Sequence, residues 1–269
     1  MGQNIASWAS GMSILDRSDQ YESYDPLHAF ARDELLCKQA ASSQATICHI
    51  WLHPNAFVLG QRDYRLPLAK QAMEWLRTNN FLPVIRHSGG AAVPLDPGVV
   101  NLSLIFPIRE TSFHHDFTMM VQLIQEALAF TGLSVDVGEI NGAYCPGDFD
   151  LSINGKKFCG IAQRRQLRAF SVQAFINAET SHYNRASLVR QFYERATAGA
   201  KATSYPKVTE HSTASLEELA HLGPQAAQTF ITAIKDTLIA NGAQLSNMQQ
   251  PSNEDVHELA ALLKQRYES

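Results

Sequence analysis

The sequence predicts an α+β fold: a mixed, largely antiparallel sheet flanked by helices, followed by a mainly helical C-terminal region. Three observations predict it. Up to residue 132, apolar or alternating stretches typical of strands are interleaved with stretches of helical spacing. An Asn-Gly pair at 154–155 separates two extended stretches and indicates a hairpin. Beyond about Asn184, apolar residues recur mainly at helical spacing.

The two ends of the chain are expected to differ from its main part. Residues 1–24 are polar and weakly patterned, and we interpret them as an N-terminal arm that is flexible or loosely docked. A main domain is expected over 25–250, and a C-terminal helix over 251–269 is expected to pack on it. Asp25 as an N-cap and Pro26 at the first helical position mark the start of the main domain.

The first half of the main domain alternates between strands and helices. In order, the sequence predicts a helix after Pro26, strands over 45–53 and 56–60, a helix over 67–80, strands over 81–87, 91–95 and 99–108, and a helix from Asp116 to Gly132. The strand over 99–108 is apolar enough to be buried on both faces. The hairpin around 154–155 and a strand over 167–179 follow.

Composition and charge exclude several classes of protein. The chain has 269 residues, 45% of them hydrophobic, which is enough to bury a sizeable core. A net charge of −4 gives no concentrated positive field, so we expect neither a nucleic-acid partner nor a membrane surface. No apolar run approaches the ~20 residues that span a bilayer. The N-terminus lacks the pattern of a secretory signal, and we expect a cytoplasmic protein.

The four cysteines are Cys37, Cys48, Cys145 and Cys159. None belongs to a CxxC pair, and no histidine lies at zinc-ligand spacing from them, which argues against a disulfide framework and against a structural metal site. Three of the four are expected to be small buried side chains. The open question is whether the fourth is reactive.

A glycine-rich loop interrupts the strands in VIRHSGGAAV, residues 84–93. Gly89 and Gly90 allow close approach of the backbone and expose N–H donors to a ligand carbonyl or phosphate, with Arg86 at the mouth. The alternative is a tight turn without a ligand. No Gly-Lys-Ser or Gly-Lys-Thr follows, so the loop is not a Walker loop.

Cys145 precedes Pro146-Gly147 and therefore lies in a loop, where a reactive cysteine is more common than in a strand. On the strand after the Asn-Gly turn, Lys156 and Lys157 point to opposite faces, so only one can face a pocket. Lys157 shares its face with Cys159. An ammonium close to a thiol stabilises the thiolate. The alternative is that both lysines are solvated residues of a strand edge.

The glycine loop and the lysine hairpin, in this order, resemble those of the lipoate–protein ligase and octanoyltransferase family, which shares its catalytic fold with biotin ligases. The Arg-x-Ser-Gly-Gly-type loop is RHSGGAAV here, and the Gly-Lys-Lys-x-x-Gly-type hairpin is GKKFCG. The resemblance covers roughly Pro26 to Arg195. It implies a biotin/lipoate ligase-like catalytic domain over 25–250.

Three activities occur in the family. Ligases use ATP and a free acid, octanoyltransferases use octanoyl-acyl carrier protein, and amidotransferases move octanoyl or lipoyl groups from the glycine cleavage H protein. The cysteine in AYCPGDFD resembles the loop of the transferases, and SGGAAVPLD resembles the amidotransferase pattern. The implied donor is the octanoylated H protein. The implied acceptors are lipoyl domains of 2-oxoacid dehydrogenase acyltransferase subunits.

The resemblance also implies roles for individual residues. Cys145 would be the acyl-thioester nucleophile, and Lys157 would favour its thiolate and be the nearest candidate general acid. No cofactor or metal is implied. The implied substrate-binding residues are Arg86, Ser88, Gly89, Gly90, Ala91, Asn101 and Gly160. We expect the acyl chain to lie along residues of AAV and NLSLIF.

Three other functions remain open from the sequence. They are octanoyl transfer from acyl carrier protein to the H protein, ATP-dependent lipoate ligation, and carrier binding without catalysis.

Overall fold

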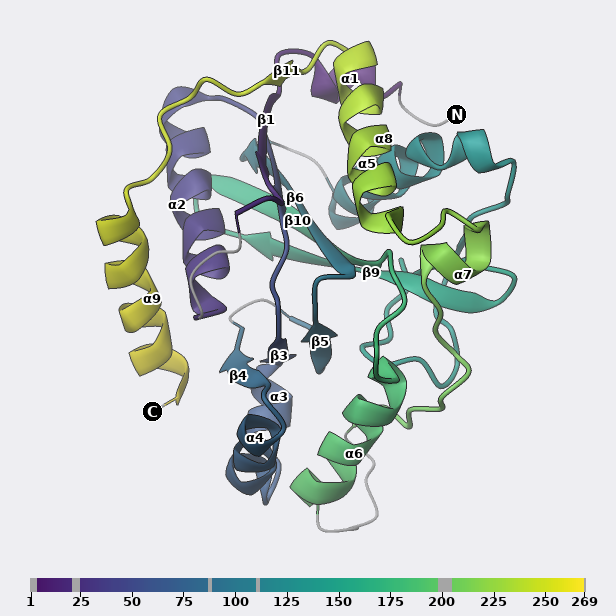
Figure 1. Cartoon of the computed structure of the whole chain (residues 1–269). Helices are drawn as coiled ribbons and strands as arrows, with labels where there is room; N and C mark the ends of the chain where they lie inside the picture. Colours follow the sequence, from purple (N-terminus) through teal and green to yellow (C-terminus); the bar gives the residue numbers. More distant parts are fainter. Residues whose placement is uncertain (1–3, 21–24, 87–88, 110–111, 198–204, 269) are drawn as a thin grey trace.

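A mixed sheet of eight strands forms the centre of the molecule (Figure 1). The computed structural model describes residues 4–20, 25–86, 89–109, 112–197 and 205–268. The strand order is β11-β1-β2-β6-β10-β9-β8-β7. The strands are β1 (Ser13–Arg17), β2 (Ile47–Trp51), β6 (Val99–Pro107), β7 (Asp136–Val137), β8 (Leu151–Ile153), β9 (Lys156–Arg165), β10 (Ala169–Asn177) and β11 (Gln244–Leu245). Among the described strands of this sheet, β1 pairs in parallel with β2 and β11 and the other pairs are antiparallel, which confirms the predicted mixed, largely antiparallel sheet.

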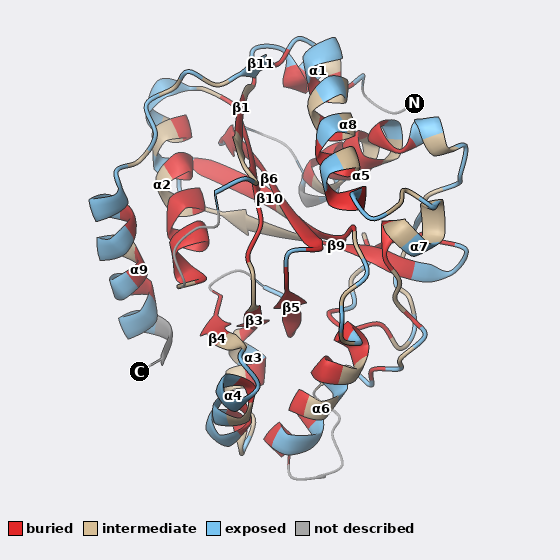
Figure 2. Cartoon of the chain, in the orientation of Figure 1, coloured by how far each residue is buried: buried red, intermediate tan, exposed pale blue. Residues whose placement is uncertain are grey.

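Helices cover both faces of this sheet. Helix α2 (Leu27–Ser43) packs on β6 and β10 from one side, and α9 (Asn253–Glu268) packs against α2. Helices α5 (Phe113–Ala127) and α8 (Ala226–Ala240) cover the other side, beside the short helices α1 (Ala6–Ala9) and α7 (Leu216–Ala220) and the 3-10 turn at Ala129–Thr131. Buried residues concentrate on the strands between these layers (Figure 2). Strand β6 is buried at all 9 positions, as its apolar sequence predicts.

A second, three-stranded sheet lies below the first in Figure 1 and was not distinguished in the sequence. Its order is β4-β3-β5, with strands β3 (Ala56–Leu59), β4 (Leu82–Ile85) and β5 (Val93–Leu95). Helices α4 (Ala69–Thr78) and α6 (Arg185–Thr197) pack on it and on each other, and the short α3 (Gln61–Tyr64) follows β3. The glycine loop connects β4 to β5, so this small sheet carries one side of the site.

The described residues 4–20 do not form the flexible or loosely docked arm that the sequence suggested, because they belong to the main sheet and its core. Strand β1 pairs with β2 in parallel over its whole length. Trp8 and Met12 are buried in the main core, and the Trp8 ring meets Phe106 edge-on. The segment is too short to show a clear periodicity, and it is held by residues far away in the sequence.

Two local predictions are also refined by the structure. Helix α5 begins at Phe113 rather than at Asp116, because the Ser112 hydroxyl accepts the N–H of His115 and caps the helix. The hairpin prediction is confirmed, since Asn154 and Gly155 have φ of 52° and 72° between β8 and β9. In the part of the chain that the structure describes, no helix is long and apolar enough to cross a bilayer.

Candidate active site

Cys145 lies in the loop between β7 and β8, as predicted, but its side chain is buried rather than exposed. Its backbone has a left-handed φ of 46°, which is uncommon for a residue with a side chain. The sulfur lies 3.3 Å from Nη2 of Arg86 and 3.3 Å from the backbone N–H of Ala91. The thiol therefore faces the glycine loop, in which Ala91 lies 54 residues earlier in the sequence.

Two glycines allow this close approach. A Cβ on Gly90 would lie 2.2 Å from Nη2 of Arg86 and 3.0 Å from the sulfur of Cys145. A Cβ on Gly60, which precedes α3, would lie 2.0 Å from the carbonyl oxygen of Gly90. The backbone at Gly60, between β3 and α3, thus lies directly against the glycine loop, and neither glycine position has room for a side chain.

Arg86 is buried, and its described hydrogen bonds come from Nη2. Its Nη2 also donates to the carbonyl of Ala91 at 2.8 Å. Next to it, Asp63 accepts the hydroxyl of Tyr193 at 2.9 Å, and burial raises the pKa of Asp63 while the nearby charge of Arg86 opposes this. The Nε–H of Arg86 is buried and has no hydrogen-bond partner among the described residues, so one donor of this side chain remains unused.

Lys157 points inward and Lys156 outward, as the alternation along the strand predicts. The ammonium of Lys157 donates to the carbonyl oxygens of Tyr144 at 3.0 Å and Cys145 at 2.6 Å, and it pairs with Asp150 at 2.7 Å. Burial raises the pKa of Asp150 to about 6, although the Lys157 charge acts in the opposite direction. The described contacts of Lys157 are therefore with the backbone of the cysteine loop rather than with the sulfur.

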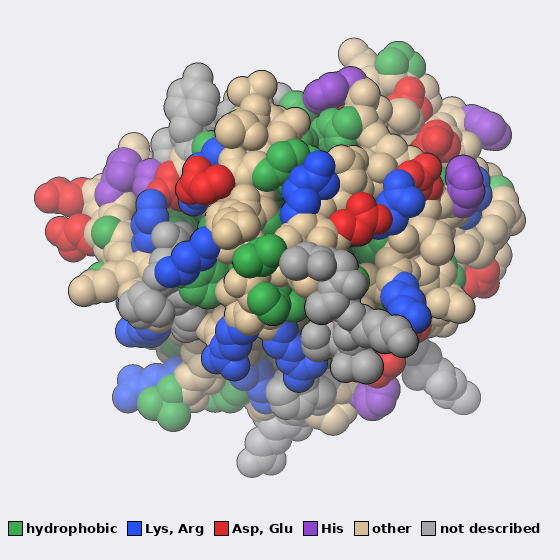
Figure 3. All heavy atoms as spheres, turned by 90° about the horizontal axis from the view of Figure 1, so that it is seen from below, with side chains coloured by type: hydrophobic (Ala, Val, Ile, Leu, Met, Phe, Trp, Pro, Cys, Tyr) green, Lys and Arg blue, Asp and Glu red, His purple; other side chains and the backbone are tan. Residues whose placement is uncertain are grey.

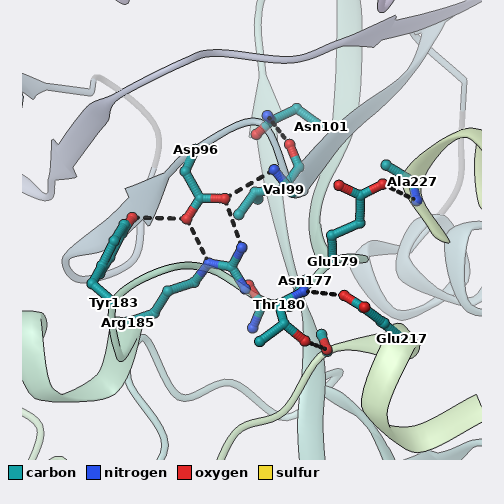
Figure 4. Close-up of polar contacts among 12 residues, drawn as sticks. Asp96, Val99, Asn101, Asn177, Glu179, Thr180, Tyr183, Arg185, Glu217 and Ala227 are labelled. Carbon is teal, nitrogen blue, oxygen red and sulfur yellow. Dashed lines mark hydrogen bonds and ion pairs between the residues drawn. The ribbon is translucent and has the colours of Figure 1, made fainter. Parts of the chain in front are cut away.

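Buried polar groups fix the strand ends behind this loop. Tyr144 exchanges hydrogen bonds with the side chain of Asn177, and its ring stacks on Phe175. Close by, Arg185 at the start of α6 donates to both carboxylate oxygens of Asp96, at 2.6 and 2.8 Å, and Tyr183 donates to the same carboxylate (Figure 4). These contacts join the β5–β6 turn to α6.

A mainly apolar pocket begins beside Arg86 and runs over the face of the main sheet that α2 covers. Its apolar lining comes from Phe30, Trp51, Val58, Val93, Leu95, Ala162, Ala174 and Phe175. Asn101, Ser103 and Gln173 form the polar part of its floor. The buried carboxylate of Asp33 accepts bonds from Ser103 at 2.6 Å and Gln173 at 2.7 Å, which fixes this floor.

The structure brings most of the predicted site residues together. Arg86 and Ala91 contact the thiol, and Gly90 lies against it. Asn101 lines the pocket. A Cβ on Gly160 would lie 2.5 Å from the ring of Phe175, so this glycine gives room to a pocket residue.

Other predicted residues lie apart from the thiol or outside the described chain. Gly89 is exposed, and a Cβ there would meet no heavy atom within 4 Å. Ser88 lies outside the described residues. Cys159 is fully buried in the main core, in agreement with a packing role.

The sequence reasoning missed Asp150 and the pocket residues Phe30, Val58 and Phe175. Asp150 stands in CPGDFD near the lysines, so its charge was a usable signal. The pocket residues come from separate elements and carry no motif.

Comparison with known proteins assigns this site to a family. Residues 25–239 match the family model of the lipoyl protein ligase A/B catalytic domain. The chain belongs to this family. Its lipoyl protein ligase A/B catalytic domain includes Cys145, the glycine loop and the lysine hairpin.

Two relatives of this chain carry the same protein name. The octanoyl-[GcvH]:protein N-octanoyltransferase of Anoxybacillus flavithermus is 40% identical over 210 residues, which are 77% of this chain and 76% of that protein. The protein of the same name from Geobacillus kaustophilus is 39% identical over 237 residues, 86% of this chain and 83% of its own length.

Solved structures of lipoate ligases have the same fold as this lipoyl protein ligase A/B domain. A lipoate-protein ligase A bound with ATP matches with a TM-score of 0.66 at 17% identity, over 97% of this chain and 96% of its own. A bi-partite lipoate protein ligase from Thermoplasma acidophilum matches with a TM-score of 0.64 at 17% identity, over 97% and 94%. These matches confirm the predicted lipoate ligase fold.

Proposed function

We propose that this protein is an acyltransferase that moves an octanoyl or lipoyl group from the glycine cleavage H protein to lysines of lipoyl domains, through a thioester on Cys145. The relatives named octanoyl-[GcvH]:protein N-octanoyltransferase support the donor and the reaction. The observation that carries the nucleophile assignment is the thiol of Cys145, which meets two hydrogen-bond donors beside an apolar pocket.

The proposed reaction has two steps that together exchange one amide for another. The Cys145 thiolate attacks the acyl carbonyl carbon on the donor lysine, the C–N bond breaks, and the lysine amine leaves after taking up one proton from solvent. The amine of the acceptor lysine then attacks the thioester, the C–S bond breaks, and the thiolate and one proton are released. Arg86 and the N–H of Ala91 are suitably placed donors for the charge that develops beside the sulfur.

The acyl chain would occupy the pocket beside Arg86. An octanoyl chain is apolar, and most of the pocket is lined by aliphatic and aromatic side chains. Val93 and Asn101 belong to the AAV and NLSLIF stretches that the sequence suggested for this purpose.

The donor and the acceptor are folded carrier proteins, so the surface near the pocket must accept a protein domain. The side of the molecule that contains α4 and α6 carries many Lys and Arg side chains, several of them gathered below its centre (Figure 3). Carrier domains with acidic surfaces would suit this side. We expect the reaction in the cytoplasm, where thiols remain reduced, because the mechanism requires a free Cys145.

The test is to incubate the protein with octanoyl-H protein and follow its intact mass, then to add an apo-lipoyl domain. We expect a mass gain of one octanoyl group on the wild type and its loss to the acceptor. Cys145→Ala should gain nothing, and Cys159→Ala, a matched buried cysteine, should still become acylated.

Two further arms separate the alternatives within the family. Acylation from octanoyl-acyl carrier protein but not from octanoyl-H protein would assign the other transferase activity. Lipoyl-domain modification from octanoate and ATP, unaffected by Cys145→Ala, would assign a ligase. Acylation of Cys145→Ala from octanoyl-H protein would refute the nucleophile assignment.

A further inference from the structure

Three exposed cations lie on the segment that follows β3, next to the candidate active site. They are Arg62 on α3, Arg65 directly after α3, and Lys70 on α4, and we call them the basic patch. Among the described residues, none of the three forms an ion pair with a carboxylate. Arg77, farther along α4, differs from them because it pairs with Glu74.

The three cations of the basic patch are neighbours in space. Arg62 and Arg65 are three positions apart in a helical turn, a spacing that brings their side chains together. The ammonium of Lys70 lies 5.8 Å from the centre of the ring of Tyr64, which directly precedes Arg65. Like charges at such distances repel one another and destabilise the fold. A negatively charged surface bound to the patch would relieve this repulsion.

Helix α3 fixes the basic patch against the glycine loop. A Cβ on Gly60, the residue before α3, would lie 2.0 Å from the carbonyl oxygen of Gly90. Asp63 points inward, where it accepts the N–H of Gly60 at 2.8 Å and the hydroxyl of Tyr193 at 2.9 Å. Consecutive Cα atoms are about 3.8 Å apart, so the Cα of Arg62 lies within about 8 Å of that of Gly60. A protein bound to the patch therefore lies beside the loop that the thiol faces.

The charge of the basic patch favours an acidic protein as its partner. The whole chain has a net charge of −4, so the patch is a local excess of positive charge on an acidic molecule. The side of the molecule that contains α4 and α6 shows such Lys and Arg side chains in Figure 3. Opposite charges on two surfaces speed their association and fix their orientation. Arginine and tyrosine, as in Arg62, Tyr64 and Arg65, are also enriched among the residues that dominate binding energy.

We propose that the basic patch of Arg62, Arg65 and Lys70 is the docking surface for the carrier domain, and that it pairs with acidic side chains beside the acylated lysine of that domain. This proposal rests on the proposed function, in which the acyl donor is a folded carrier protein. The patch orients the carrier so that its acylated lysine enters beside the glycine loop, and it takes no part in the chemical steps.

The test compares two triple variants with the same change of net charge, using acylation of Cys145 followed by intact mass. The patch variant carries Arg62→Glu, Arg65→Glu and Lys70→Glu. The control variant reverses three exposed cations that lie elsewhere: Lys38→Glu, Arg109→Glu and Arg168→Glu. Lys38 lies on α2, and Arg109 and Arg168 lie beyond the ends of β6 and β9 that are farthest from the cysteine loop.

With octanoyl-H protein at low salt, the patch variant should lose about tenfold or more in kcat/KM, because its reversed charges repel the carrier. The loss should shrink at high salt, where exposed charges are screened. The control variant should lose much less. An uncharged small thioester, S-octanoyl-N-acetylcysteamine, should acylate the wild type and both variants at equal rates, because it needs no docking surface.

Three results would overturn the proposal. Equal losses in the two triple variants would show that net charge matters and the position of the patch does not. A patch variant that also reacts slowly with the small thioester would have a defect in the site itself. A patch variant that reacts normally with octanoyl-H protein but no longer binds phosphatidylglycerol vesicles would assign the patch to a lipid surface.

The unsubstituted protein provides a second measurement. A carbodiimide activates carboxylates of octanoyl-H protein, and the amine of a nearby lysine then forms an amide with the carboxyl carbon while the reagent leaves as its urea. Peptide mass spectrometry should find these amides at Lys70 and not at Lys38, which is equally exposed in class. Amides at Lys38 with none at Lys70 would overturn the proposal.

This proposal and the proposed function fail separately. Octanoyl transfer that survives Cys145→Ala refutes the thioester mechanism, whatever the triple variants show. Acylation of Cys145 that proceeds equally well in the wild type and the patch variant refutes the docking surface and leaves the nucleophile assignment in place.

Discussion

At the scale of single residues, Gly90 gives the most direct test of the packing around the thiol. Its φ is 101°, and a Cβ would lie 2.2 Å from Arg86 Nη2 and 3.0 Å from the sulfur of Cys145. Gly90→Ala should therefore displace both side chains. We expect the rate of acylation to fall and the free energy of unfolding to drop by about 1 kcal/mol or more.

The neighbouring glycine provides the control. A Cβ on Gly89 would meet no heavy atom within 4 Å, and Gly89 is exposed. Gly89→Ala should change intact-mass acylation kinetics and urea unfolding much less than Gly90→Ala. Equal effects of the two variants would show that the close approach at Gly90 has no part in the site.

The raised pKa of Asp150 predicts that its contribution to the stability of the fold falls as the pH rises. Burial raises its pKa from 3.8 to about 6 in the folded protein, so the folded state binds this proton more tightly than the unfolded chain. Its stabilising contribution is fully present below pH 3.8 and is lost as the pH rises through about 6. The full difference corresponds to about 3 kcal/mol at most.

The measurement is urea unfolding of the wild type and Asp150→Asn between pH 4.5 and 7.5. Asn cannot titrate, so the stability of the wild type relative to the variant should grow as the pH falls through about 6. A difference that stays constant, or that grows toward high pH, would contradict the assignment of a raised pKa to this carboxyl.

Single residues also show which features of the site could be predicted from the sequence. The Pro-Gly after Cys145 placed it in a loop, and the alternation of a strand separated buried Lys157 from exposed Lys156. The contact of Arg86 with the sulfur joins positions 59 residues apart, and no local pattern reports it. The left-handed backbone of Cys145 was equally hidden, because nothing in the sequence favours a positive φ at cysteine.

At the scale of elements, the long and strongly patterned segments were predicted well. Strand β6 is buried throughout, and the β8–β9 hairpin has the positive φ values that Asn-Gly implies. The separation into two sheets was not predictable, because β3, β4 and β5 look like the other strands and only their partners differ. Because β4 and β5 pair with β3 in the small sheet, the glycine loop that connects them lies on the side of the site that this sheet forms.

The register of strands β9 and β10 predicts which end of the pocket lies far from the thiol. On β9, Gly160 pairs with Phe175, and Ala162 pairs with Gln173 two residues farther from Lys157. Two strand residues span about 7 Å. Ala162→Leu should fill the far end of the pocket, and it should lower transfer of octanoyl more than transfer of butanoyl.

The measurement is kcat/KM for octanoyl-H protein and butanoyl-H protein with the wild type and Ala162→Leu. We expect the ratio of the two values to shift by about tenfold in favour of butanoyl. The short donor is the internal control, because it uses the same thiol and the same docking surface. An unchanged ratio would show that the octanoyl chain does not reach this end of the pocket.

At the scale of the whole molecule, the N-terminal segment belongs to the fold rather than to a mobile arm. Strand β1, the first strand of the chain, lies between β2 and the last strand, β11. Trp8 is 3% exposed and packs with β6 residues in the main core. The sequence hid this role, since a strand of five residues has little periodicity of its own and the pairing is with distant segments.

This role predicts that Trp8→Ala destabilises the whole domain and not only its N-terminus. Truncation of a buried aromatic side chain costs about 3–5 kcal/mol, because burial is lost and a cavity remains. Ser7→Ala, one residue earlier and exposed, should stay within about 0.5 kcal/mol of the wild type. The free energies come from urea unfolding followed by both far-UV circular dichroism and tryptophan fluorescence. If residues 4–20 belong to the sheet, Trp8→Ala should lower the urea midpoint equally by both probes, and Ser7→Ala should leave it unchanged. Equal unfolding curves for the two variants would contradict this role and indicate an arm.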